Sequence, residues 1–108
     1  MAGVKIRLYV PSESKGQPIN PHTREDVLKT LKTVLCRRCG GYTTIEADGG
    51  WLNDQGVLIE EHVTIIESVI PAGLRAWDIA EDLATVIKAA LDQDCVLYEI
   101  THTDANCI

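Results

Sequence analysis

The fold of this 108-residue chain is decided by the stretch VKIRLYV at residues 4–10, in which apolar and polar side chains alternate. This period of two predicts a strand with one buried face, because successive side chains of a strand point to opposite sides of a sheet. The aliphatic residues then face the core, and Lys5, Arg7 and Tyr9 face away from it. Pro11 ends the strand.

Two helices are predicted by apolar residues at helical spacing. Residues 23–39 have such a stripe, with Thr23 as the expected N-cap and Gly40-Gly41 as the stop. Residues 74–91 have a second stripe, which places Leu83 and Ile87 in the core and Trp77 opposite them. Residues 11–22 contain three prolines and many small polar residues, so we expect a flexible loop there.

The remaining strands form a long hairpin and a last strand. Residues 42–52 predict the second strand, which Gly49-Gly50 interrupts as a bulge or bend. The turn at residues 53–56 leads to a third strand over 57–70, and the last strand covers 96–101. Because the hairpin is longer than a small sheet requires, we expect part of it to project as an arm.

The order strand, helix, strand, strand, helix, strand consists of two right-handed crossover units joined by a hairpin. The predicted fold is therefore α+β and ferredoxin-like, with βαββαβ order and two helices on one face of a four-stranded antiparallel sheet. We expect residues 1–108 to form a single domain, because this length is close to the commonest domain size.

Glycine and aromatic residues in the middle of the chain carry a resemblance. They are Gly41-Tyr42-Thr43-Thr44, Gly50-Trp51, Gly56-Val57-Leu58-Ile59 and Glu61. In these residues the chain resembles an uncharacterised family of small bacterial proteins with a ferredoxin-like fold. The resemblance implies the fold, and it implies no activity, cofactor or catalytic residue.

The composition excludes several classes of partner. The net charge is −6, which argues against a nucleic-acid binder because phosphate contacts need a basic surface. No apolar run reaches membrane-spanning length, and the N-terminus lacks the pattern of a signal peptide. We therefore expect a cytoplasmic protein with reduced cysteines and neither nucleic acid nor membrane as partner.

Two short motifs have a chemical interpretation. Cys36 and Cys39 form a CxxC, which occurs in redox dithiols and zinc sites, but they fall at the end of a predicted helix, where the helix dipole opposes a thiolate. No second CxxC completes a zinc site, so we expect four free thiols, no metal and no cofactor. Glu60 and His62 share a strand face and can form an acid/base pair, but we favour the interpretation as a charged β-arm.

The sheet face opposite the helices is the candidate binding surface. We assign to this surface the side chains of Lys5, Arg7, Tyr9, Ile65 and Ile66, together with the exposed helix residue Trp77. We expect Glu46, Glu67 or Glu99 to pair with Lys5 and Arg7. The projecting hairpin leaves Trp51, Leu58 and Ile59 in need of cover. Because a two-fold dimer covers both copies of such a patch, we expect a homodimer, with a different protein partner as the alternative.

No catalytic residue set is evident, since the sequence contains no GxGxxG, no P-loop and no nucleophile elbow. The leading hypothesis is a non-catalytic protein-binding or regulatory module, with a mobile element as a candidate source. The alternative is a small dimeric α+β-barrel enzyme or small-molecule binder, with a pocket between sheet and helices near Tyr9, His62 and Tyr98.

Overall fold

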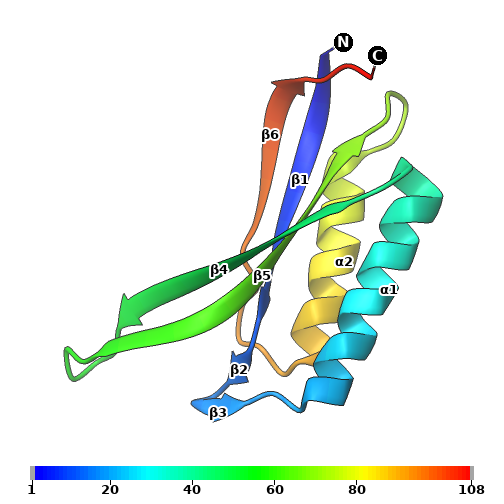
Figure 1. The fold of residues 1–108 in the computed structure, drawn as a ribbon. Coiled ribbons are helices and arrows are strands. Elements are labelled where there is room, and N and C mark those ends of the chain that lie inside the picture. Colours follow the sequence, from blue (N-terminus) through cyan, green and yellow to red (C-terminus); the bar gives the residue numbers. More distant parts are fainter. Residues whose placement is uncertain (1, 108) are drawn as a thin grey trace.

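The computed structural model describes residues 2–107, and over that range the element order matches the predicted fold. The elements are β1 (Ala2–Pro11), β2 (Glu13–Ser14), β3 (Gln17–Pro18), α1 (Pro21–Cys39), β4 (Thr43–Leu52), β5 (Leu58–Ile70), α2 (Ala76–Ala90) and β6 (Tyr98–Asp104). The long strands form one antiparallel sheet in the order β4-β5-β1-β6. Helices α1 and α2 lie side by side on one of its faces (Figure 1). The α+β, ferredoxin-like prediction is confirmed.

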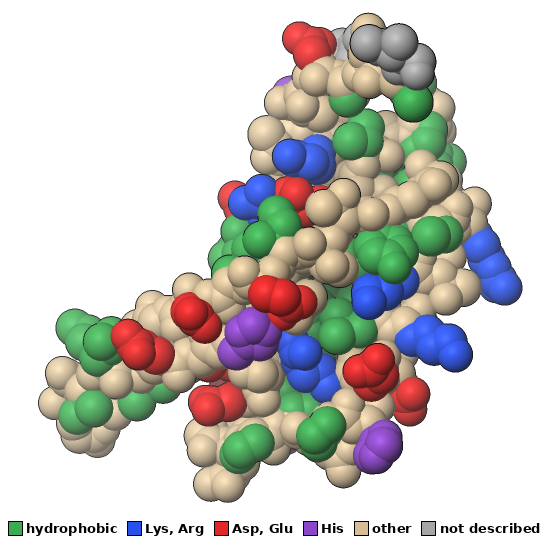
Figure 2. Space-filling view, in the orientation of Figure 1, with side chains coloured by type: hydrophobic (Ala, Val, Ile, Leu, Met, Phe, Trp, Pro, Cys, Tyr) green, Lys and Arg blue, Asp and Glu red, His purple; other side chains and the backbone are tan. Residues whose placement is uncertain are grey.

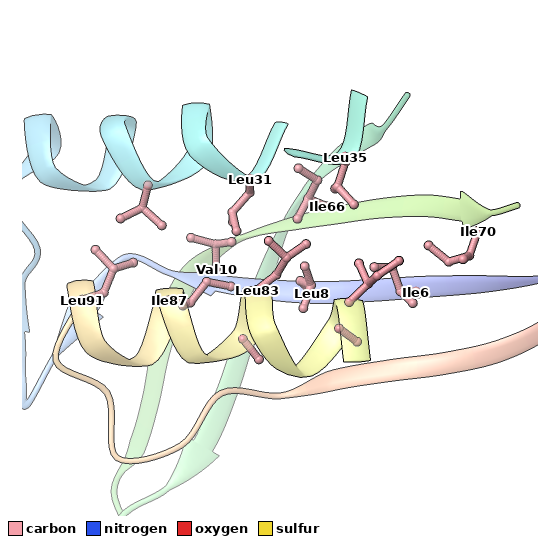
Figure 3. Close-up of a cluster of buried hydrophobic side chains, with 14 residues drawn as sticks. Ile6, Leu8, Val10, Leu31, Leu35, Ile66, Ile70, Leu83, Ile87 and Leu91 are labelled. Atoms are coloured by element: carbon pink, nitrogen blue, oxygen red, sulfur yellow. The ribbon is translucent and has the colours of Figure 1, made fainter. Parts of the chain in front are cut away.

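The core lies between the helices and the sheet. Ile6, Leu8 and Val10 of β1 have no exposed surface, as the alternation in β1 predicts. Side chains of α1, α2 and β5 close over them (Figure 3), including Leu31, Leu35, Ile66, Leu83 and Ile87. Val34 is only partly buried at the margin of this cluster. The core is entirely aliphatic, so the aromatic residues lie on its periphery or outside it.

The β4–β5 hairpin is longer than the rest of the sheet. Its strands pair without a break from Thr43 opposite Glu67 to Leu52 opposite Leu58. Only the part nearest β1 packs under the helices, and the remainder extends away from them (Figure 1). This arm makes the molecule 48 Å long and only 27 and 23 Å across. The predicted projecting hairpin is therefore present.

The predicted N-cap of the first helix is wrong by three residues, because Asn20 and not Thr23 occupies this position. Helix α1 begins at Pro21, and the Asn20 side chain accepts hydrogen bonds from the backbone N–H groups of His22 (2.9 Å) and Thr23 (3.3 Å). Proline fits the first helical position because the N–H that it lacks would have no partner there. Gly40 ends the helix as predicted, with a left-handed φ of 93°.

The predicted bulge at Gly49-Gly50 is also wrong, because these residues pair in regular register with Glu61 and Glu60. At Gly50 the absence of a side chain has a steric explanation, because a Cβ there would lie 3.3 Å from the carbonyl oxygen of Ile59. Further bounds also differ from the prediction. Part of the 11–22 loop forms the β2–β3 hairpin, α2 is shorter at both ends, and β6 begins and ends later in the sequence.

Candidate functional site

A row of side chains crosses the helix-free face of the sheet at Arg7. In the strand register Arg7 lies opposite Glu67 of β5 on one side and Glu99 of β6 on the other. Thr43 of β4 extends the row beyond Glu67. Because β1 is a central strand, this row has its basic group in the middle of the sheet and a carboxylate on each side.

The Glu67 carboxylate is the most buried charged group on this face, with a side chain that is 11% exposed. Its Oε2 accepts a hydrogen bond from Arg7 Nε at 2.7 Å and lies 3.7 Å from Lys5 Nζ. Its hydrogen bond to Arg7 is the main cause that raises the pKa of the guanidinium. Within residues 2–107 the other oxygen, Oε1, accepts no hydrogen bond, so it is free for a ligand.

Tyr9 and Glu99 form the second pair of the face. The Tyr9 hydroxyl donates a short hydrogen bond to Glu99 Oε1. This bond, with burial as the second cause, raises the pKa of Tyr9 above its ordinary value of 10.0. Tyr9 is therefore a neutral donor at physiological pH. No lysine or arginine of residues 2–107 forms a salt bridge with Glu99, so its negative charge is uncompensated in the described structure.

Apolar side chains flank these charged pairs. Ile65 is nearly buried beside Tyr9, whereas Ile45, Val69 and Leu97 are exposed on the same face. Ile66 was assigned to this surface from the sequence, and that assignment is wrong: it lies on the helix side, fully buried in the core. Adjacent residues of a strand point to opposite faces, so Ile65 and Ile66 cannot share a surface.

A groove of about 380 Å³ adjoins the Glu67 carboxylate at the point where the chain enters β4. Its lining combines the charged pair with an aromatic ring, a thiol and the end of β5, and consists of Lys5, Cys39, Gly41, Tyr42, Thr43, Glu67, Ser68 and Val69. Volumes of this order are usual for small-molecule sites. Tyr42, Thr43 and Ser68 were not assigned to a site from the sequence, because the groove depends on where β4 starts relative to β5.

The predicted pocket between the sheet and the helices is wrong, because the core side chains fill that space. Tyr9 and Tyr98 are on opposite faces of the sheet, and His62 lies on the projecting hairpin, so these three residues do not converge. Trp77 is 64% exposed, as expected, but it packs edge-on against Tyr98 with 6.3 Å between ring centroids. It is therefore separate from the Arg7 row.

His62 pairs across the hairpin rather than along its own strand. Its Nε2 forms a short contact with Glu46 Oε2, and its Nδ1 lies 3.7 Å from Asp48 Oδ1. The acid/base pair considered for Glu60 and His62 therefore does not form. Of the three carboxylates expected to pair with the cations of β1, Glu67 does so, whereas Glu46 pairs with His62. Burial opposes ionisation of Glu46, but hydrogen bonds from Thr64 and His62 and the charge of Arg24 together lower its pKa.

The two cysteines of the CxxC have different surroundings. Cys36 is exposed at the end of α1, whereas Cys39 is half-buried, and burial raises the pKa of its thiol. Among residues 2–107 no three histidine, cysteine or acidic side chains are grouped as metal ligands.

Exposed large apolar side chains gather at the hairpin tip. Leu52 is 67% exposed, and Trp51, Val57 and Leu58 are each about half exposed, while Ile59 is partly buried. Figure 2 shows hydrophobic side chains at the tip and acidic side chains along the length of the arm. Such a surface is a typical site of contact with another chain.

Comparison with known proteins identifies the fold but no sequence family. No protein-family model and no curated protein matches the sequence. The uncharacterised bacterial family suggested by the central residues is thus not identified by sequence. No helix within residues 2–107 has both the length and the apolar character needed to cross a membrane.

Solved structures do match. A phage SAM lyase in its apo state superposes with a TM-score of 0.70 over 94% of this chain and 81% of that chain, at 21% identity. A phage SAM lyase in complex with S-methyl-5'-thioadenosine gives a TM-score of 0.68 at 22% identity, covering 92% and 80% of the two chains. The divalent ion tolerance protein CutA1 from Ehrlichia chaffeensis gives 0.59 at 10% identity, over 98% and 87%. At these identities the likeness shows the fold alone.

Proposed function

We propose that residues 1–108 form one domain that binds a small sulfur-containing nucleoside on the helix-free face of its sheet, and that it acts on SAM (S-adenosylmethionine). The observation that carries the proposal is the Glu67 carboxylate, which is nearly buried on a face that the helices leave open. The likeness to phage SAM lyase, including a complex with S-methyl-5'-thioadenosine, supports this ligand class. The proposal favours the small-molecule alternative over the non-catalytic module, with the site moved to the open face.

The charges of the open face suit SAM, which has a carboxylate, an ammonium group and a sulfonium cation. Lys5 and Arg7 are cations that a ligand carboxylate can approach, and each retains about a third of its side-chain surface exposed. Glu99 and the free Oε1 of Glu67 can accept hydrogen bonds from the ammonium group, and the negative charge of these carboxylates attracts the sulfonium. Exposed Val69 and Leu97 offer apolar contact for the rest of the ligand.

The chemistry of such a reaction makes modest demands on the site. Release of S-methyl-5'-thioadenosine from SAM breaks the bond between sulfur and the γ carbon of the amino acid part, and the bonding pair moves to sulfur. The leaving thioether is neutral, so no general acid is needed. Either the substrate's own carboxylate attacks the γ carbon and closes a lactone, or a base removes the β proton and an alkene forms. Glu99, which has no cationic partner among residues 2–107, is the base in the second route.

Self-association is part of the proposal. The apolar tip residues Trp51, Leu52 and Leu58 extend beyond the sheet, and the open face contains exposed apolar residues beside its charged pairs. Contact of the arm with a second copy would bury both surfaces, and a homodimer is the commonest such assembly. We expect sedimentation equilibrium to show a dimer and Leu52→Ser with Leu58→Ser to shift it toward monomer. A monomeric wild-type chain would refute this part.

The non-catalytic protein-binding module remains the second candidate, favoured by the exposed hairpin tip and Trp77. It predicts that the arm, rather than the Glu67 region, is the functional surface.

Calorimetric titration with SAM and with S-methyl-5'-thioadenosine, followed by chromatography of SAM incubated with the protein, decides between the two. We expect both ligands to bind and S-methyl-5'-thioadenosine to accumulate. Glu67→Gln should weaken binding by about tenfold or more, because a charge-assisted contact is lost. Glu60→Gln, on an exposed residue of the same strand, is the matched control and should bind as wild type. Absence of binding and of turnover would refute the proposed function and leave the binding module.

A further inference from the structure

Strand β5 continues past the start of β4, and this leaves part of its edge without a strand partner. The last β4 pair is Thr43 opposite Glu67, whereas β5 runs on to Ile70. Val69 still lies opposite Lys5 of β1, but no β4 residue faces it on the other side. The free edge at Val69 therefore lies beside the Glu67 carboxylate.

The hydrogen-bond pattern fixes which backbone groups face this edge. At the turn, Asn53 N–H donates to Val57 C=O at 3.0 Å, so in this register the odd-numbered residues of β5 direct their N–H and C=O groups toward β4. The pairing of β1 with β6 gives the same result. Tyr9 N–H donates to Leu97 C=O at 3.2 Å, so the odd-numbered residues of β1 bond toward β6 and its even-numbered residues bond toward β5. Both polar groups of Val69 thus point away from β1, and within residues 2–107 neither makes a hydrogen bond.

These groups open into the groove already described, which Val69 lines together with Tyr42, Lys5 and Glu67. The Ser68 hydroxyl donates to the Gly41 carbonyl at 2.7 Å and so fixes the opposite wall, where a strand partner of Val69 would otherwise lie. Tyr42 contributes an exposed aromatic ring, with Lys32 Nζ at 5.6 Å from its centroid. The groove thus combines an N–H donor, a C=O acceptor and an aromatic surface.

We propose that the free edge of Val69 binds the adenine base of the ligand: Val69 N–H donates to adenine N1, and the N6 amino group donates to Val69 C=O. Adenine presents a donor directly beside an acceptor, which complements a backbone N–H and C=O, and Tyr42 contacts its ring. The sugar and sulfur then extend toward Glu67 and Arg7. This inference rests on the proposed function, and it adds a specificity that the charged pairs cannot provide.

The direct test compares two ligands and two variants by calorimetric titration. The ligands are S-methyl-5'-thioadenosine and S-methyl-5'-thioinosine, whose base reverses the pattern to an N1–H donor beside an O6 acceptor. The variants are Val69→Pro, which removes the free N–H, and Val69→Ala, which keeps it. Proline is tolerated where an edge N–H has no ladder partner, so the sheet should stay intact. Thermal unfolding followed by circular dichroism verifies this.

We expect wild type to bind the adenine compound at least about tenfold more tightly than the hypoxanthine compound, because unpaired polar groups are costly. Val69→Pro should bind the adenine compound about tenfold more weakly than Val69→Ala, because both variants lose the valine side chain and only the proline variant also loses the N–H donor. If wild type binds both bases equally, or if the two variants behave alike, the inference is overturned and the proposed function stands. If wild type binds neither compound, both fall. A Val69 amide protected from hydrogen exchange without ligand would also overturn the inference, since another chain would then occupy the edge.

Discussion

The two faces of β1 have opposite character. On one face Ile6, Leu8 and Val10 are fully buried against the helices. On the other, Lys5 and Arg7 flank the Glu67 carboxylate, and Tyr9 binds Glu99. The same seven residues therefore supply the centre of the core and the centre of the candidate site.

The difference has a physical cause. The even-numbered side chains stabilise the fold by removing apolar surface from water, and this hydrophobic effect has no directional requirement. Because the core is closely packed, it tolerates few changes in side-chain volume. The odd-numbered side chains interact through directional bonds at specific positions and leave acceptors open. A strand that is covered on one side only can thus maintain stability and chemistry independently, and substitutions on the two faces should have different consequences.

The largest expected effect is on the core face. Leu83→Ala should lower the free energy of unfolding by about 2–5 kcal/mol, because it leaves a cavity against the buried side of the sheet. Lys88→Ala on the same helix, an exposed position, should change it by less than about 0.5 kcal/mol. Urea unfolding measures both, and equal effects would mean that α2 does not bury this face.

A smaller effect is expected on the open face. Arg7→Met should destabilise the protein more than Lys5→Met, because the nearly buried Glu67 loses its hydrogen-bonding cation. Lys5→Met should cost less than about 1 kcal/mol, since its longer contact is partly exposed. The same urea measurement applies. A larger loss for Lys5→Met than for Arg7→Met would show that the pairing around Glu67 differs from the structure.

The smallest effect is the pH dependence from Tyr9. Because the folded protein raises the pKa of Tyr9, its contribution to stability is complete below the ordinary value of 10.0 and is lost as the pH rises through the folded pKa. Absorbance at the tyrosinate band should show one group that ionises later than the others, and Tyr9→Phe should remove it. If Tyr9→Phe instead removes a tyrosine that ionises near the ordinary pKa of 10.0, the hydrogen bond from Tyr9 to Glu99 is absent.

Patterns within single elements were sufficient for the fold. The alternation over residues 4–10 and the helical stripes gave the faces of β1, α1 and α2, and the chain order gave the sheet. One error arose where two local signals competed, since both Asn20 and Thr23 are suitable N-caps and Asn20 is the one used. Another arose where a residue's surroundings depend on a paired strand, as for Gly50 beside the Ile59 carbonyl. In each case local composition was the only guide.

The candidate site was predicted only in part, because some of its residues follow from the pattern of one strand and others depend on how two strands pair. Lys5, Arg7 and Tyr9 followed from periodicity, and Glu67 was among the predicted partners. The partner of His62 required the β4–β5 register, which brings Glu46 beside it. The groove required the exact start of β4, because Tyr42 and Val69 line it only where that strand ends and β5 continues. Sequence periodicity specifies neither the register between β4 and β5 nor the residue at which β4 begins.

The central claim is that the helix-free face binds the ligand, and neighbouring side chains of β5 test it directly. Ile65 and Val69 lie on the open face, whereas Ile66 and Ile70 lie in the core. Nuclear Overhauser contacts between S-methyl-5'-thioadenosine and assigned methyl groups should appear for Ile65 and Val69 and be absent for Ile66 and Ile70. Contacts confined to the hairpin tip, or no contact with any open-face methyl in a protein that binds the compound, would contradict the account.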